Sequence, residues 1–368
     1  MKNSIYFIDS SASDNYGLYI HSISCALSKP ELTFVVPYNY KYESNKTWKL
    51  FNFFSSKFKM KLIQKIFKFF EFFLSFFLIY LKLFFSFNSK KIVIISLYQP
   101  FVSFYYFFKI LKLSNFKLIV IIHDLVPFQS TYPKFVLCDQ NKLLALADSF
   151  VAHNVHSKNE LTKLNKPVYL FRFPLLREKN FQINNNFFSK NSKLKFLLIG
   201  HLRYEKGVDI LVEAWKEYVK IFSNSELIIA GSLVPGFNLD VQGIPSIIVM
   251  SKYLDDNDYG NLICSCDYGI LPYRFGTNSG IFSSFFSMGK PVISSNINLF
   301  TDSFFSHEEL IFDINSGALG LFDKLCFVSK DVETNCLKFS SFVQSRITLY
   351  ENSFTEEVNY FYEKISNN

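Results

Sequence analysis

The chain alternates short apolar runs with segments of helical spacing over nearly its whole length. The runs with the length and composition of β-strands are SIYFI (4–8), LTFVVPY (32–38), KIVIIS (91–96), KLIVIIH (117–123), SFVAH (149–153), PVYLF (167–171), LKFLLIG (194–200), ELIIAG (226–231), SIIVM (246–250), YGILPY (268–273), KPVISS (290–295) and ELIFD (309–313). Several are continuous Ile, Leu, Val and Phe runs, which is typical of parallel strands covered on both faces. The pattern predicts two α/β sheets with helical crossover connections.

A polar stretch divides the two series of strands. Residues 177–193, REKNFQINNNFFSKNSK, are rich in Asn, Ser and Lys and lack apolar periodicity, which predicts a linker. We therefore expect two Rossmann-like domains, over 1–176 and 194–368, facing one another across a cleft. The tail EVNYFYEKI (357–365) has the spacing of a final amphipathic helix, where the chain can cross back over that cleft.

Composition adds an uneven distribution of charge. With 46 Phe, 21 Tyr and a hydrophobic fraction of 49%, core material is abundant, which excludes a disordered protein. The net charge is +8, but residues 1–180 carry 24 Lys and Arg against 10 Asp and Glu, while residues 181–368 carry 15 against 21. The basic half favours an anionic membrane surface over nucleic acid, because its lysines lie among Phe, Leu and Ile.

The segment KFKMKLIQKIFKFFEFFLSFFLIYLKLFF (57–85) predicts a helix that is apolar except for one narrow polar stripe. Two interpretations stay open: a helix covering a sheet with its lysines pointing outward, and an interfacial helix whose aromatic side chains enter the membrane. Its longest uncharged run, FFLSFFLIYL (72–81), is shorter than the ~20 residues that a membrane span needs.

The remaining compositional signals favour a cytoplasmic protein without a metal. The apolar run after the first residues ends at Asp9, which predicts no signal peptide. The six cysteines form no CxxC pair and read as reduced core thiols. No cluster of residues suggests a metal site or a bound cofactor. We expect localisation in the cytoplasm, peripheral on the inner face of the cell membrane.

Two turns in the second half carry the candidate chemistry. In KFLLIGHLRYEKGVDILVEAWKEY (195–218) a buried strand leads through a glycine turn into a helix, so that Gly200, Arg203 and Lys206 project from the strand's carboxyl end. Two cations there can neutralise a diphosphate and stabilise it as a leaving group. A solvated loop with ordinary surface charges is the alternative for this turn taken alone.

The later stretch TNSGIFSSFF (277–286) has the pattern of a helix N-terminus that binds an anion. The amides of Ser279, Gly280 and Ile281 would open the helix, while Thr277 and Asn278 add polar donors. A plain N-capping turn is the alternative for this element by itself. No Asp or Glu lies between Asp267 and Asp302.

Together, HLRYEKG (201–207) and the PYR, TNSG and GKPVI elements (272–293) resemble the nucleotide-sugar half of GT-B glycosyltransferases, and more closely glycosyltransferase family 4 (glycosyl transferases group 1). That family carries a G-x-x-x-x-x-K-G turn and a later glycine-helix-GxPV element. The resemblance implies that Arg203, Lys206 and the amides of Ser279 to Ile281 hold the donor diphosphate. Many members have two Glu where this chain has Gly276 and Ser284, which bears on recognition of the donor ribose. His201 stands where many have Arg.

The resemblance also assigns the first domain to the acceptor. It implies a glycine loop after the first strand, which the stretch SSASDNYGLY (10–19) can supply, with Asn15 and Tyr16 on the acceptor side and Gly17 near the transferring sugar and its diphosphate. It implies that His123, followed by Asp124, contacts sugar or acceptor at a strand's carboxyl end. His153 and His156 are expected to cap the next strand-helix turn.

The reaction so implied is a hexosyl transfer with retention, from a nucleotide diphosphate sugar to a saccharide, in which His123, Arg203 and Lys206 are the catalytic candidates. Around the nucleoside we expect Lys252, Tyr253 and Ser284. The acceptor would be a lipid-linked saccharide of bacterial surface polysaccharide assembly, such as O-antigen, capsule or lipopolysaccharide. Two alternatives stay open: a catalytically weakened scaffold that binds membrane or a partner transferase, and a sugar-nucleotide epimerase.

Overall fold

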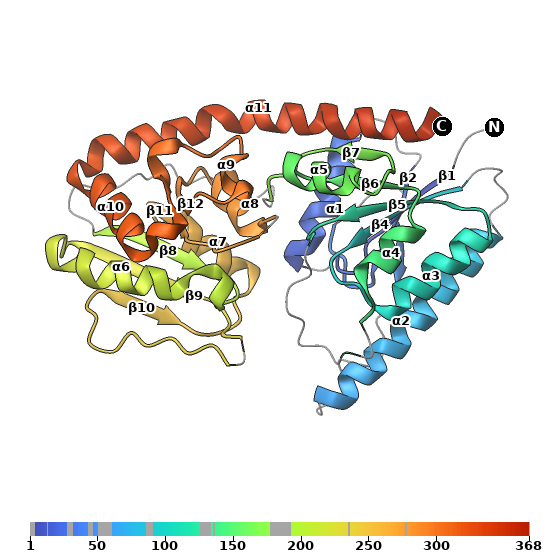
Figure 1. The fold of residues 1–368 in the computed structure, drawn as a ribbon, viewed down its shortest axis with the longest axis horizontal. Helices are drawn as coiled ribbons and strands as arrows, with labels where there is room; N and C mark the ends of the chain where they lie inside the picture. Colours follow the sequence, from blue (N-terminus) through green and yellow to red (C-terminus); the bar gives the residue numbers. More distant parts are fainter. Residues whose placement is uncertain are drawn as a thin grey trace. The chain divides into compact units, whose positions relative to one another are not determined.

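The computed structural model describes residues 4–12, 14–27, 32–42, 47–50, 61–85, 91–125, 134, 137–176, 193–234, 236–276 and 278–367. It divides into two compact units, one made of Met1–Pro174 with Phe354–Asn368 and the other of Leu175–Ser353 (Figure 1). Each unit is built on a parallel sheet whose strands are joined by helical crossovers.

The first unit contains a seven-stranded sheet in the order β3-β2-β1-β4-β5-β6-β7, with every neighbouring pair parallel. Its strands are β1 (Ser4–Ile8), β2 (Leu32–Pro37), β3 (Thr47–Leu50), β4 (Lys91–Leu97), β5 (Lys117–Ile122), β6 (Ser149–Ala152) and β7 (Val168–Leu170). After their first residue, β4 and β5 are buried along their whole length, as their unbroken apolar runs predict. The sequence pattern does not predict β3, because TWKL is a short edge strand without an apolar run.

The helices of the first unit begin with α1 (Asp14–Ala26) and α2 (Lys61–Phe84), followed by α3 (Val102–Leu113), α4 (Gln140–Leu146) and α5 (Val155–Thr162). The predicted helix over 57–85 is thus present from Lys61, and residues 57–60 lie outside the described residues. α2 and α3 lie side by side (Figure 1). The rings of Phe76 and Phe107 stack between them at 4.5 Å, and Lys91 donates to the last carbonyls of α2.

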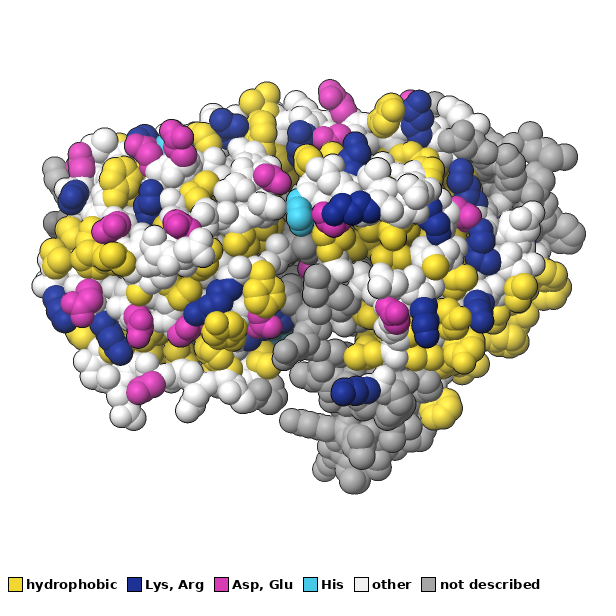
Figure 2. All heavy atoms as spheres, in the orientation of Figure 1, with side chains coloured by type: hydrophobic (Ala, Val, Ile, Leu, Met, Phe, Trp, Pro, Cys, Tyr) yellow, Lys and Arg dark blue, Asp and Glu magenta, His cyan; other side chains and the backbone are white. Residues whose placement is uncertain are grey.

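Several other side chains of α2 and α3 face solvent. Those of the described residues form what we call the α2–α3 apolar surface: Phe70, Leu74, Phe77, Leu78, Phe84 and Phe85 at α2, with Tyr106, Ile110 and Leu113 on α3. Figure 2 shows hydrophobic side chains gathered along this edge of the first unit with lysines among them. Within the described residues, no helix combines the length and the apolar content that crossing a bilayer requires.

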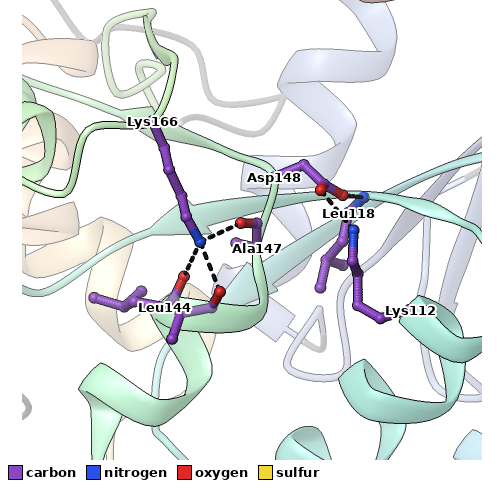
Figure 3. Close-up of polar contacts among 7 residues, drawn as sticks. Lys112, Leu118, Leu144, Ala147, Asp148 and Lys166 are labelled. Atoms are coloured by element: carbon purple, nitrogen blue, oxygen red, sulfur yellow. Dashed lines mark hydrogen bonds and ion pairs between the residues drawn. The ribbon is translucent and has the colours of Figure 1, made fainter.

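Polar contacts at the start of β6 fix the part of the sheet that carries the histidines. Lys166 donates to the carbonyls of Leu144 and Ala147 at 3.1 and 2.6 Å, and so closes the end of α4. Asp148 accepts from the backbone N–H of Leu118 at 2.7 Å, which joins the start of β6 to β5 (Figure 3). The amino-terminal ends of β5 and β6 are therefore held as neighbours, and the parallel pairing of the two strands continues from there.

The second unit contains a six-stranded sheet in the order β10-β9-β8-β11-β12-β13. Its strands are β8 (Leu194–Ile199), β9 (Ser225–Ala230), β10 (Ile247–Met250), β11 (Tyr268–Leu271), β12 (Val292–Ser295) and β13 (Ile311–Phe312). Its helices are η3 (Tyr204–Lys206), α6 (Val208–Ile221), α7 (Asp256–Ser265), α8 (Gly280–Ser287), α9 (Asn298–Thr301), η4 (Glu308–Leu310), η5 (Ile314–Ser316) and α10 (Gly317–Lys330). β8 and β11 are adjacent, so the segments that follow them leave the same edge of the sheet.

The last helix, α11 (Val332–Asn367), differs from the expected domain bounds. The sequence predicts a second domain that runs to residue 368, whereas the chain from Phe354 on belongs to the first unit. Glu357 pairs with Arg172 at 2.8 Å, and Asn359 donates to the carbonyl of Ala26 at 2.8 Å. Apart from Lys193, the predicted linker lies outside the described residues.

Candidate functional site

The turn after β8 has a backbone that only glycine fits at one position. Gly207 has φ +64° and separates η3 from α6. A Cβ on Gly207 would lie 1.9 Å from the carbonyl oxygen of Pro272, so the turn packs directly against the segment that follows β11. Gly200 makes a second close approach, because its Cβ would lie 2.3 Å from the Cδ1 of Ile281 at the start of α8.

Arg274, which sequence reasoning did not single out, ties the same two segments together. Its guanidinium donates to both carboxylate oxygens of Asp209, at 2.8 and 2.6 Å, and to the carbonyl of Tyr204 at 2.7 Å. Its backbone N–H donates to the carbonyl of Glu205 at 2.9 Å. A planar guanidinium holds such a fork more rigidly than an ammonium would. The sequence feature that could have pointed to Arg274 is the PYR triplet directly after β11.

The predicted diphosphate cations gather around Tyr273. The ammonium of Lys206 lies 3.6 Å from the centre of the Tyr273 ring. Burial raises the pKa of the Tyr273 hydroxyl, and nearby Ser279 and Arg203 partly oppose the rise. The buried Tyr273 hydroxyl lies beside the Ser279 side chain, but no hydrogen bond of ordinary geometry joins it to another described residue. Lys206, Arg203 and the start of α8 therefore converge on one region of the second unit.

The electrostatics of this region are positive. Burial lowers the pKa of His201, and the charges of Arg203 and Lys206 lower it further. The neutral imidazole of His201 lies 2.7 Å from the hydroxyl of Ser232. Arg203 has an acidic neighbour in Glu205, 3.7 Å from its Nε. An anion with more than one charge suits such a site better than a neutral ligand.

α8 begins as predicted. Ser279 is its N-cap, and the side chain accepts from the N–H of Phe282 at 3.2 Å. Asn278, Gly280 and Ile281 are partly exposed, whereas Thr277 lies outside the described residues. The first turn of α8 thus faces the glycine turn after β8 from the other segment.

The three residues expected around the nucleoside differ in exposure. Lys252 pairs with Asp258 at 3.0 Å, and Tyr253 is 71% exposed. Ser284 is buried, and its hydroxyl donates to the carbonyl of Gly280 at 2.9 Å. Ser284 therefore bonds within its own helix, and its contact with a nucleoside stays a prediction.

In the first unit the predicted glycine loop is only partly a loop. The chain is helical from Asp14, so Gly17 lies in α1, where its Cβ would come within 3.1 Å of the Tyr42 ring. The side chains of Asn15 and Tyr16 lie outside the described residues. The loop after β1 is thus shorter than 10–19, because α1 starts soon after it.

His123 lies at the end of β5, as predicted, in a buried cluster of polar and aromatic side chains. Its Nε2 is 2.7 Å from the hydroxyl of Ser96, and its ring stacks on Tyr98 with centroids 3.9 Å apart and planes at 4°. Burial and the neighbouring His153 hold the pKa of His123 well below its usual value. Its neighbour Asp124 is partly exposed, and its carbonyl accepts from Gln140.

The prediction that His153 caps the next helix is wrong. Asn154 is the N-cap of α5, and its side chain accepts from Ser157 at 2.7 Å. His153 instead belongs to the buried cluster, where its ring nitrogens meet the Tyr19 hydroxyl at 3.1 Å and the Phe171 carbonyl at 3.0 Å. Burial lowers the pKa of His153 to about 4.

Sequence reasoning also missed Asp9, which follows β1 and is fully buried. It accepts from the backbone N–H of Ser11 at 2.8 Å and from the Tyr98 hydroxyl at 3.4 Å. Burial raises the pKa of Asp9 to about 7. Its place at the carboxyl end of a central strand was the available signal. Among the described residues, no group of three or more His, Cys, Asp and Glu is placed to hold a metal ion.

Part of the second unit is similar in sequence to a known family. Residues 193–325 match the sequence model of the family described as "Glycosyl transferases group 1", and no curated protein matches the chain significantly. The match makes part of the second unit similar to group 1 glycosyltransferases, and the chain as a whole has the GT-B fold of two Rossmann-like units.

Solved structures similar to the whole chain share its fold at low identity. The N-terminal domain of trehalose-6-phosphate phosphatase from Candida albicans has a TM-score of 0.67 at 10% identity, over 99% of this chain and 96% of that one. An α,α-trehalose-phosphate synthase (UDP-forming) from Burkholderia vietnamiensis has a TM-score of 0.64 at 8% identity, over 100% of both chains. HepE from Anabaena, in complex with UDP and glucose, has a TM-score of 0.63 at 11% identity, over 100% of both chains.

Proposed function

We propose that the second unit binds a nucleotide diphosphate sugar and that the protein transfers its sugar to a saccharide with retention of configuration. The observation that carries the proposal is the convergence of Lys206 and Arg203 with the first turn of α8 around Tyr273. A diphosphate placed there would receive two positive side chains and the free N–H groups of a helix N-terminus.

This arrangement suits a diphosphate that departs with negative charge. Cations and oriented amides fixed in a partly buried site stabilise a leaving group without reorganisation during the reaction. The absence of Asp and Glu between Asp267 and Asp302 fits a reaction in which the diphosphate oxygen itself helps remove the acceptor proton. Neutralisation by Arg203 and Lys206 would also take the place of a metal ion.

The proposal also covers the nucleotide base of the donor and the residues that meet the acceptor. HepE was solved with UDP and glucose, and the Burkholderia enzyme is named as UDP-forming, so UDP-sugars are the first donors to test. Around the nucleoside we propose Lys252 and Tyr253. On the acceptor side we propose His123 and Asp124 of the first unit.

We further propose that the acceptor is a lipid-linked saccharide of bacterial surface polysaccharide assembly, reached at the cytoplasmic face of the membrane. The α2–α3 apolar surface supports this, since contiguous exposed apolar side chains mark interaction sites. The excess of Lys and Arg over residues 1–180 adds attraction to anionic lipid.

A catalytically weakened scaffold is the second candidate. Gly276 and Ser284 stand where many family members have Glu, which favours a protein that binds a nucleotide without efficient transfer. The two candidates differ in turnover and agree in donor binding, so both properties have to be measured.

A thermal-shift panel of UDP, GDP, CDP and ADP sugars tests donor binding, because a ligand of the folded state raises the melting temperature. We expect one base class to stabilise the protein and Arg203→Ala and Lys206→Ala to remove the effect. Lys220→Ala is the matched control, since Lys220 pairs with Glu217 on the exposed face of α6. Stabilisation that survives both site variants would contradict the proposal.

Turnover separates the two candidates. Released nucleoside diphosphate and the anomeric configuration of the product report transfer directly. An α-linked sugar made from an α-linked donor supports retention, and binding without turnover over a broad set of lipid-linked acceptors supports the scaffold.

A further inference from the structure

Four neighbouring strands of the first unit place polar side chains at adjacent positions of the sheet. Ile8, the last residue of β1, pairs with Ile95 of β4 in parallel register, so Asp9 and Ser96 are the next residues after this pair. Ser96 pairs with Ile121, and Ile121 pairs with Val151. His123 and His153 lie two residues after Ile121 and Val151, directly past the ends of β5 and β6. Since side chains alternate along a strand, these four point to the same face.

Ser96 lies with its hydroxyl between the carboxyl group of Asp9 and the imidazole of His123. Its hydroxyl is 2.7 Å from the Nε2 of His123, and it contributes a hydrogen bond that stabilises the charged form of Asp9. A hydroxyl has one proton and two lone pairs, so it donates in one direction at a time. All three side chains are almost completely buried, so the hydrogen bonds cannot be exchanged freely for water.

The other ionisable groups that face the cluster keep their charge near neutral pH. Burial lowers the pKa of His153 to about 4 and raises the pKa of Tyr19 and Tyr40 above the usual range. Tyr98, which follows β4, touches both Asp9 and His123 through its hydroxyl and its ring. Within the described residues, no Lys or Arg forms an ion pair with Asp9. Asp9, whose pKa burial raises to about 7, is therefore the group that changes charge.

We propose that the protonation state of Asp9 selects, through Ser96, which ring nitrogen of His123 carries the proton. When Asp9 is protonated, its O–H donates to Ser96, the Ser96 hydroxyl donates to Nε2, and His123 carries its proton on Nδ1. When Asp9 loses its proton to solvent, the Ser96 hydroxyl donates to the carboxylate. His123 then donates from Nε2 to the Ser96 oxygen, and Nδ1 carries no proton. The imidazole stays neutral in both states.

The consequence for binding depends on the proposed function, in which His123 meets the sugar or the acceptor. An Nδ1 with a proton donates to a hydroxyl or carbonyl oxygen, whereas a bare Nδ1 accepts from a hydroxyl. Asp9 and Ser96 are thus positioning residues that act through His123 and need not touch the substrate.

The test is two-bond ¹H–¹⁵N correlation spectroscopy of the full chain with ¹⁵N-labelled histidine, without substrate. The nitrogen shifts distinguish the two tautomers, and His123→Gln assigns the signals. We expect the tautomer of His123 to change with a midpoint near pH 7, while His201 and His307 of the second unit serve as internal references for an intact fold.

Three variants decide the outcome. Asp9→Asn is expected to leave His123 in one tautomer from about pH 5 to about pH 9, and Ser96→Ala to abolish the dependence on Asp9. Tyr98→Phe keeps the ring but removes one hydrogen bond to the carboxylate, so the change should persist with a higher midpoint. A His123 that keeps one tautomer in the native chain, or a change that persists unaltered in Asp9→Asn, would overturn the proposal.

The experiment separates this inference from the proposed function because it needs neither donor nor acceptor. A tautomer change with no sugar transfer supports the inference and removes only its catalytic consequence. Transfer that proceeds while His123 keeps a single tautomer contradicts the inference and leaves the glycosyltransferase assignment in place.

Discussion

The ammonium of Lys206 lies 3.6 Å from the centre of the Tyr273 ring, and these residues come from the segments after β8 and β11. Cation–π contacts of this kind contribute about 0.5–2 kcal/mol, most where the pair is desolvated. Tyr273 is fully buried, so its ring fixes the position from which Lys206 would meet a diphosphate.

The Tyr273 hydroxyl gives the first prediction. It is buried beside Ser279 without a hydrogen bond of ordinary geometry to any described residue, and a poorly satisfied buried polar group costs about 1–3 kcal/mol. We expect Tyr273→Phe to raise the free energy of unfolding of the unliganded protein by about 1 kcal/mol. If the hydroxyl contacts the donor, the same change should weaken nucleotide binding about fivefold in calorimetric titration.

Tyr268→Phe is the matched control. The Tyr268 hydroxyl is also buried, beside Cys336, without a hydrogen bond of ordinary geometry to any described residue, but the Tyr268 ring packs in the core against Phe196 and Phe339. The control variant should stabilise the protein to a similar extent and leave nucleotide affinity unchanged. Equal affinities for both variants and the native protein would show that Tyr273 does not contact the nucleotide.

The second prediction concerns the close approach at Gly207. An alanine Cβ would lie 1.9 Å from the Pro272 carbonyl oxygen and would also sit at φ +64°. We expect Gly207→Ala to lower the free energy of unfolding by about 3 kcal/mol or more, because both the backbone strain and the clash oppose it. Urea denaturation measures the effect.

Gly243→Ala measures the backbone strain of a positive φ without a steric clash of the added Cβ. Gly243 has φ +73°, but nothing lies within 4 Å of the position its Cβ would take. This variant should lose only about 1 kcal/mol. If the two variants were equally stable, the contact between the glycine turn and the segment after β11 would not matter to the fold.

The presence of two parallel sheets was predictable because continuous apolar runs indicate strands that are buried on both faces, without any knowledge of which strands pair. The approach of the turn that carries Lys206 to the segment after β11 was predictable for a related reason. Both segments follow strands of one parallel sheet and leave it at the same edge. The short edge strand β3 and the start of α1 inside the predicted loop carry no such pattern.

Asp9 and Arg274 could not be assigned from the sequence because their roles depend on partners far away along the chain. The burial of Asp9 follows from the register of β1 against β4, some ninety residues later, and the role of Arg274 follows from its fork with Asp209. Spacing along one segment reveals neither. For the same reason His153 was misread as a cap, although it belongs to the cluster around Tyr19.

The third prediction is a pair of opposed pH dependences in the first unit. The pKa of Asp9 is raised from 3.8 to about 7, so its stabilising contribution is complete below pH 3.8 and is lost as pH rises to 7. The pKa of His153 is lowered from 6.5 to about 4, so its contribution is complete above pH 6.5 and is lost as pH falls to 4. These shifts correspond to about 4 and about 3 kcal/mol.

The contributions of Asp9 and His153 can be separated by subtracting the free energy of unfolding of the native protein from that of each variant at every pH. The stability of Asp9→Asn relative to native should rise between pH 3.8 and 7, and that of His153→Gln should fall between pH 4 and 6.5. Urea unfolding followed by Trp48 fluorescence in a Trp215→Phe background reports the first unit. Parallel curves for the native protein and Asp9→Asn would mean that Asp9 ionises normally in the folded state.

The last prediction concerns the α2–α3 apolar surface and a membrane. Leu113 and Ile110 of α3 are 87% and 39% exposed, and burying a leucine-sized side chain in an apolar medium stabilises by about 1.5–3 kcal/mol. We expect Leu113→Glu with Ile110→Glu to reduce sedimentation with anionic vesicles more than tenfold, whereas Leu319→Glu, at a 67% exposed leucine of the second unit, should have no effect. The lysines beside this surface should make native binding weaker on neutral vesicles and at high salt. Binding that survives the α3 substitutions would show that the α2–α3 apolar surface is not the contact, and equal binding to neutral and anionic vesicles would remove the role of the lysines. No binding to either kind of vesicle would remove the membrane from the proposed function.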